Sequence, residues 1–111
     1  MINLTRPFLV VGGGIAGMAA AILLRRMGVP VHLVELDPDW RVYGTGISIT
    51  GPTYRALGRL GLLDDVQRFG FDSTKGIRIH TAAGIAVAEV PTVAVAPGLP
   101  SGGGIMRRAI A

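Results

Sequence analysis

Three glycines near the start of the chain, Gly12, Gly14 and Gly17, have the spacing G-x-G-x-x-G. They follow a short apolar run and precede a stretch rich in alanine and leucine. In a strand–turn–helix unit, the first glycine of this motif permits the tight turn and the second lets a pyrophosphate approach the backbone. The third lets the helix pack closely on the strand. Since the N–H groups and the positive dipole end of a helix favour phosphate, we expect a dinucleotide-binding turn here.

An acidic residue in the position that such a unit requires is Glu35, at the end of the next predicted strand. It follows the glycine motif at close to the roughly 20-residue spacing expected of a ribose-binding carboxylate. Its two oxygens can accept hydrogen bonds from both ribose hydroxyls and would repel a 2′-phosphate. The residues therefore argue against NADP at this site and leave FAD and NAD open.

The elements that must position these residues are a strand, a helix and a second strand, predicted at 8–11, 15–27 and 31–35. Together they fit the roughly 30 residues of a βαβ unit. Gly28 is placed to end the helix in a left-handed conformation. The first strand is a short, continuous apolar run that ends in glycines, which is typical of a parallel sheet.

The remainder of the chain is predicted to alternate between helices and a hairpin. Residues 40–49 have no clear helical period, whereas Pro52 suits the first turn of a helix. Residues 91–104 contain three prolines and four glycines and are predicted to form a loop or crossover. The predicted elements are helices at 52–60 and 62–69, strands at 76–81 and 85–90, and a helix that begins at 105 and runs to 111.

The composition excludes several classes of site. The chain has no cysteine, which rules out disulfides, thiolate metal sites and cysteine nucleophiles. Its net charge is +4, but the basic residues are scattered and only 5% of the residues are aromatic. Nucleic-acid binding normally requires a basic cluster with aromatic platforms, so no nucleic-acid partner is expected. Neither histidine has an acid at ligand spacing, and no metal site is expected.

The uncharged stretch from Phe8 to Leu24 superficially resembles a membrane anchor or signal peptide. It contains four glycines, and each costs a helix up to about 1 kcal/mol relative to alanine. We therefore predict no membrane span and a cytoplasmic protein. The sequence does not indicate an oligomeric state.

Beyond Glu35 the chain continues Leu36-Asp-Pro-Asp-Trp-Arg41-Val-Tyr-Gly44-Thr-Gly46-Ile. This stretch resembles the flavoprotein aromatic hydroxylases, the FAD-dependent monooxygenases of the para-hydroxybenzoate hydroxylase type, in which the acid precedes an arginine and a Gly-x-Gly-Ile segment. The family's x-Ala-Leu-x-x-Leu-Gly-Leu-x-Asp segment resembles residues 55–64, and its Ile-x-Arg-x-x-Leu helix resembles residues 105–110. The resemblance spans almost the whole chain.

The resemblance implies an α/β, Rossmann-like FAD-binding βαβ fold with a parallel sheet and helices, followed by the start of a β-rich substrate domain. Residues 1–70 would form the N-terminal part of the FAD-binding domain and residues 71–104 the first strands of the substrate domain with a crossover loop. Residues 105–111 would begin a helix that returns to the FAD domain. The chain would then be an N-terminal fragment that is inactive alone, because the family's later Asp-Gly and Gly-Asp motifs are not in it.

The implied function is NAD(P)H-driven oxygenation of an aromatic or other small organic substrate, with FAD as cofactor and NAD(P)H as co-substrate. Arg41 and Arg107 would contact the cofactor, since a planar guanidinium matches phosphate oxygens. Trp40 is predicted to pack its loop rather than to flank the adenine. The alternatives are an NAD-binding Rossmann dehydrogenase domain and a catalytically incompetent truncated fragment. No catalytic residue is assigned, and the predicted cofactor-binding residues are Gly12, Gly14, Ile15, Ala16, Gly17, Glu35, Leu36, Arg41, Gly46 and Arg107.

Overall fold

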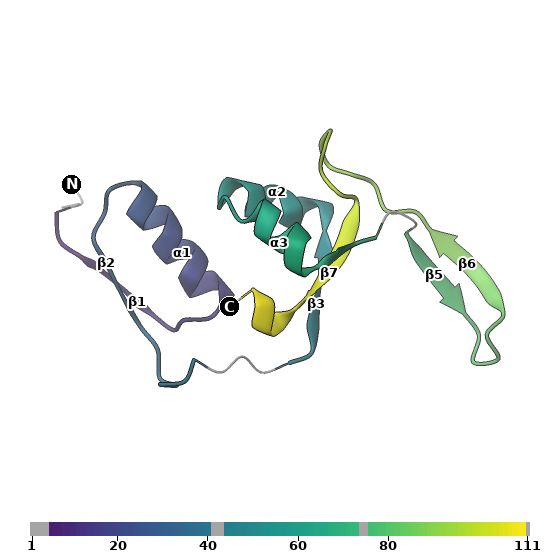
Figure 1. Ribbon diagram of the computed structural model, residues 1–111, viewed down its shortest axis with the longest axis horizontal. Helices are drawn as coiled ribbons and strands as arrows, with labels where there is room; N and C mark the ends of the chain where they lie inside the picture. The colour runs from purple at the N-terminus through teal and green to yellow at the C-terminus, as the bar shows by residue number, and fades with distance from the viewer. Residues whose placement is uncertain (1–4, 41–43, 74–75, 111) are drawn as a thin grey trace.

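The computed structural model describes residues 5–40, 44–73 and 76–110. Figure 1 shows a β1–α1–β2 unit, a middle part with two helices, and a hairpin that projects from one end. The molecule is accordingly elongated, with extents of 59 × 34 × 25 Å. In chain order the elements are β1 (Phe8–Val11), α1 (Ile15–Arg26), β2 (Val31–Val34), β3 (Gly46–Thr50), α2 (Gly51–Arg59), α3 (Leu63–Phe69), β4 (Phe71–Asp72), β5 (Ile77–His80), β6 (Ala86–Val90), β7 (Gly102–Met106) and a 3₁₀ turn, η1 (Arg107–Ala109).

The first three elements form the predicted βαβ unit. Strands β1 and β2 pair in parallel, with Phe8 opposite Val31. Parallel strands need a crossover connection, and α1 supplies it. The helix ends as predicted, because Gly28 has a φ of +76° and donates to the carbonyl of Arg25, while Val29 donates to that of Leu24. This pair of bonds is a Schellman cap.

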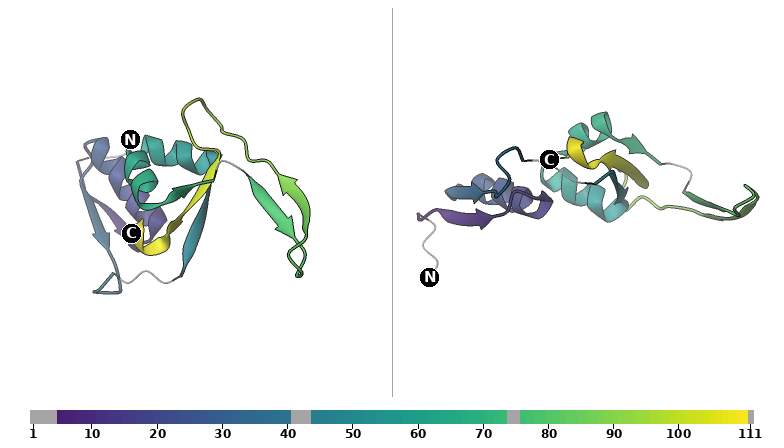
Figure 2. Two further views of the ribbon diagram at one scale, coloured as in Figure 1. Left: turned by 45° about the vertical axis from the view of Figure 1, so that its right-hand side comes forward. Right: turned by 90° about the horizontal axis from the view of Figure 1, so that it is seen from below.

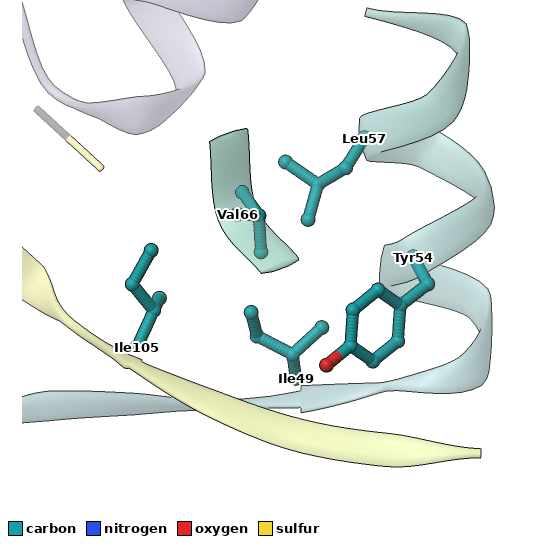
Figure 3. Packing of buried hydrophobic residues seen from close by; sticks show 5 residues of the cluster. All are labelled: Ile49, Tyr54, Leu57, Val66 and Ile105. Atoms are coloured by element: carbon teal, nitrogen blue, oxygen red, sulfur yellow. The ribbon is translucent and has the colours of Figure 1, made fainter. Parts of the chain in front are cut away.

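The middle part is a three-stranded antiparallel sheet in the order β3-β7-β4, covered by α2 and α3. Ile47 of β3 faces Ile105 of β7, and Phe71 of β4 faces Gly104 on the other side of the same strand. Figure 3 shows apolar side chains converging between this sheet and the two helices. Burying each of them contributes about 1.5–3 kcal/mol. The buried cluster consists of Ile49, Tyr54, Leu57, Val66 and Ile105.

Strands β5 and β6 form the predicted hairpin, with Ile77 opposite Val90 and an irregularity between Ile79 and His80. Every residue from 77 to 90 is exposed. Figure 2 shows the hairpin standing clear of the helices in both views. Its assignment to a separate substrate domain, together with the division at residues 70 and 104, stays a prediction.

Two predictions about the last third of the chain are wrong. Residues 102–104 were expected in a loop and residues 105–111 at the start of a helix, but residues 102–106 form β7 and only 107–109 make a 3₁₀ turn. The glycines explain the strand, because a Cβ at Gly103 would overlap the Tyr54 hydroxyl and one at Gly104 would overlap the Phe71 ring. The glycine run therefore lets a central strand pass beneath two aromatic side chains. Strands β3 and β4 were not predicted.

Candidate cofactor-binding site

The glycine turn joins β1 to α1 and owes its shape to two of its glycines. Gly12 has a φ of +99°, a left-handed conformation that side chains disfavour, and donates a 2.8 Å hydrogen bond to the Val34 carbonyl. A Cβ at Gly17 would overlap the carbonyl oxygen of Gly12. The first turn of α1 can therefore lie directly against the end of β1 only because both residues are glycine.

The start of α1 is open. Gly14 is the N-cap residue, with φ −69° and ψ 177°, and a Cβ there would meet no atom within 4 Å. Ile15 and Ala16 follow it and are exposed. No side chain in the described part of the chain caps this helix end, and its first turn holds no acidic residue. The positive end of the helix dipole and the N–H groups there are thus available to an anion.

Glu35 lies beside this turn, immediately after β2. Its Oε2 accepts a hydrogen bond of 2.5 Å from the N–H of Gly13. Its Oε1 accepts from the N–H groups of Leu36, at 2.8 Å, and Asp37, at 3.1 Å. These bonds, that from Asp37 first and that from Gly13 second, lower the pKa of the Glu35 carboxyl. The structure thus brings an ionised carboxylate to the edge of an open helix N-terminus.

Trp40 reaches the same turn from the loop after β2. Its indole N–H donates a 2.9 Å hydrogen bond to the carbonyl of Gly13. Gly13 is buried, and a Cβ on it would overlap the indole ring. Trp40 thus packs against the glycine turn, whereas Gly13 was not assigned a role from the sequence. The available signal was the unbroken run of three glycines, of which the motif explains only two.

Two of the remaining predicted residues, Gly46 and Arg107, lie near the start of β3. Gly46 faces Met106 across the sheet, and Arg107 donates its backbone N–H to the Thr45 carbonyl at 3.4 Å. The Cδ of Arg107 would lie 3.4 Å from a Cβ placed on Gly44. These residues thus form a second group, distinct from the one around Gly12–Gly17 and Glu35. Leu36 is 97% exposed, and Arg41 lies outside the described residues.

The two groups are linked through the end of the described chain. Ile110 and Ile15 line one apolar cavity of about 190 Å³, with side chains of α1 and α2 around them. The segment after Arg107 therefore lies beside the start of α1. Over the described ranges, no cluster of histidine, acidic or cysteine side chains could hold a metal ion. Within the same ranges, no helix has the length and apolar character to cross a bilayer.

A strand, a glycine turn, a helix and a second strand ending in an acid define a dinucleotide-binding unit. Residues 5–97 match the model of a protein family described as the FAD binding domain. The chain therefore belongs to this FAD-binding family, and the predicted fold class and cofactor are confirmed.

Individual relatives agree with the family. The chain is 31% identical over 86 residues to 3-hydroxybenzoate 6-hydroxylase of Polaromonas naphthalenivorans, covering 78% of this chain and 22% of the relative. It is 31% identical over 84 residues to kynurenine 3-monooxygenase of Dictyostelium discoideum, covering 72% and 18%. The solved structure of 2-methyl-3-hydroxypyridine-5-carboxylic acid oxygenase superposes with a TM-score of 0.79 at 30% identity, covering 97% of this chain and 28% of that chain.

These proteins confirm the resemblance to the FAD-dependent monooxygenases. The chain spans less than a third of the length of each.

Proposed function

We propose that the glycine turn and Glu35 hold the ADP part of FAD. The backbone N–H groups of Gly14, Ile15 and Ala16 face the pyrophosphate, and the Glu35 carboxylate accepts hydrogen bonds from the adenosine ribose. One observation carries the proposal: an exposed, uncapped helix N-terminus beside an ionised carboxylate. Gly14 fits the role since a Cβ there would stand in the open space that a pyrophosphate needs.

Glu35 has acceptor capacity for this role. An ionised carboxylate offers roughly four lone-pair positions, and the structure gives three backbone donors to Glu35. One lone-pair position on the carboxylate is therefore left for a ribose hydroxyl. The second hydroxyl would replace the Asp37 N–H, whose hydrogen bond is the longest of the three. A 2′-phosphate in the same place would meet like charge, so the proposed ligand carries an unmodified adenosine ribose.

The second group of residues is proposed to serve the cofactor beyond its adenosine. Gly46 is the first residue of β3, and Arg107 directly follows the end of β7. Leu36, which is exposed and donates its backbone N–H to the Glu35 carboxylate, is proposed to contact the cofactor beside the first group. Arg41 is assigned the same task by its place in the motif. Guanidinium groups there would neutralise phosphate oxygens through their planar fork of donors.

The proposed reaction of the protein at full length is NAD(P)H-driven oxygenation of an aromatic or other small organic substrate. The two hydroxylating relatives support this class of reaction by their names. FAD supplies the redox chemistry, and the protein supplies binding, orientation and electrostatics. The residues of this chain bind and orient the ADP part of the cofactor.

The test is FAD binding by the full-length protein, the Glu35→Gln variant and a matched control, Glu89→Gln. Glu89 is an exposed acid on the projecting hairpin, opposite Arg78. Replacing Glu35 should raise the dissociation constant of FAD by roughly tenfold or more, since hydrogen bonds to a charged acceptor are lost. The control should leave it unchanged. A wild-type protein that binds NADH but no flavin would overturn the proposal.

A further inference from the structure

The middle glycine of the turn, Gly13, occupies a position that the dinucleotide motif leaves free. Its φ lies outside the left-handed region that requires glycine, unlike that of Gly12. The need for glycine comes instead from Trp40, whose indole lies where a side chain on Gly13 would be. Gly13 is buried by this contact although its neighbour Gly14 is exposed.

The loop after β2 is built to carry the indole back to the turn. The backbone N–H of Trp40 donates to the Asp37 carbonyl at 3.0 Å, and the backbone N–H of Asp39 donates to the Asp37 side chain at 3.1 Å. Trp40 itself has a φ of 50°, a left-handed conformation that is uncommon for a bulky residue. Such conformations persist where surrounding contacts impose them, and they gather at functional sites.

Both backbone groups of Gly13 are held from outside the turn. Glu35 accepts the hydrogen bond from its N–H, and Trp40 donates one to its carbonyl. In a planar trans peptide the carbonyl and the N–H of the following residue point in opposite directions. Holding the Gly13 carbonyl against the indole therefore directs the Gly14 N–H away from Trp40, on the exposed side of the turn.

We infer that Trp40 is a positioning residue of the pyrophosphate site, acting through the Gly13 carbonyl. Its indole N–H keeps that carbonyl oxygen, which would repel a phosphate, turned away from the ligand, and so presents the Gly14 N–H to it. The inference rests on the proposed function of the turn. It adds a residue outside the glycine motif to the set that determines affinity for the pyrophosphate.

The test compares ADP, FAD and adenosine as probes on the full-length wild-type protein and its Trp40→Phe variant. Phenylalanine keeps an aromatic ring over Gly13 but has no N–H donor. We expect Trp40→Phe to weaken ADP and FAD binding by about three- to tenfold, the worth of one hydrogen bond, and to leave adenosine binding unchanged. An equal loss for adenosine, or no loss for ADP, would overturn the inference.

A second comparison uses the steric relationship between the two residues. Gly13→Ala should weaken FAD binding by about tenfold or more in the wild-type background, because the new Cβ overlaps the indole. Combining it with Trp40→Ala should remove that additional cost, so that the double variant binds no worse than Trp40→Ala alone. Strictly additive losses would contradict the coupling. A wild-type protein that binds neither FAD nor ADP would refute the proposed function itself, a result distinct from unchanged binding by the variants.

Discussion

The phenolic hydroxyl of Tyr54 donates a 2.8 Å hydrogen bond to Oδ1 of Asp72 and so joins α2 to β4. Tyr54 is 1% exposed. Burial first, and the hydrogen bond with Asp72 second, raise the pKa of Tyr54 to about 12. The same hydroxyl lies over Gly103, where a Cβ would overlap it. One hydroxyl group thus sets the distance between a helix, the central strand of the sheet and one of its edge strands.

Removing this hydroxyl should destabilise the protein. We expect Tyr54→Phe to lower the free energy of unfolding by about 1–2 kcal/mol, since a buried donor to a charged acceptor is lost. Urea unfolding of the two proteins measures the difference. Asp72→Asn, which keeps an oxygen acceptor, should lose less. Equal stability of wild type and Tyr54→Phe would show that the bond contributes nothing.

The raised pKa of Tyr54 predicts a loss of stability in alkaline solution. The ordinary pKa of tyrosine is 10.0, so between pH 10 and about 12 Tyr54 releases its proton in the unfolded protein but keeps it in the folded protein. The contribution of the protonated Tyr54 to the free energy of unfolding is therefore complete below pH 10 and is lost as pH rises through about 12. This contribution amounts to about 2–3 kcal/mol. Unfolding followed at several alkaline pH values should show wild type losing stability more steeply than Tyr54→Phe. Parallel curves would contradict the prediction.

Gly17 and Gly14 should respond differently to the same substitution. Gly17→Ala places a Cβ against the Gly12 carbonyl, so we expect a loss of about 1–3 kcal/mol in unfolding free energy as well as weaker FAD binding. The Cβ added by Gly14→Ala points into open space, so this substitution should lower the free energy of unfolding by no more than about 0.5 kcal/mol. Its FAD binding should still weaken, because the Cβ stands where the pyrophosphate approaches. Thermal melts and flavin titration of both variants separate the two effects, and tight FAD binding by Gly14→Ala would contradict the proposed ligand position.

The lowered pKa of Glu35 predicts that the protein loses stability in acidic solution. Its folded pKa is lowered from the ordinary 4.5 by three backbone N–H groups. The carboxylate therefore stabilises the fold above pH 4.5, and this contribution is lost as pH falls through the lowered folded pKa. The difference in unfolding free energy between wild type and Glu35→Gln should be largest at neutral pH and shrink in acid. A difference independent of pH would show that the charge of Glu35 is irrelevant to the turn.

The features that the sequence predicted depend on neighbouring residues. The βαβ unit follows from apolar runs around a glycine motif, and Gly28 ends α1 because a helix cap needs only adjacent residues. Pro52 marks the first turn of α2 for the same reason. Strand β7 was missed because it begins with three glycines, which carry no alternating pattern. Strand β3 was missed although Ile47 and Ile49 alternate with polar residues, because its partner strand lies far along the chain.

The candidate site also contains features that could be predicted from the sequence and features that could not. The spacing of Gly12, Gly17 and Glu35 revealed their relationship because βαβ geometry is regular. The contact between Gly13 and Trp40 could not be read from spacing, since the two residues are 27 positions apart and their contact depends on the course of the irregular loop after β2. The roles of Arg41 and Arg107 toward the cofactor stay predictions.

The position of β7 between β3 and β4 has a consequence for the order in which the protein is made. Synthesis proceeds from the N-terminus, and elements can fold as they emerge. Strand β3 and helices α2 and α3 are then complete before their central partner strand exists, because Ile105 enters the chain after Ile49, Leu57 and Val66. Until residue 106 is available, these apolar side chains lack the surface that covers them. The middle sheet can thus be assembled only after residue 106 has been made, although β3, α2 and α3 are translated earlier.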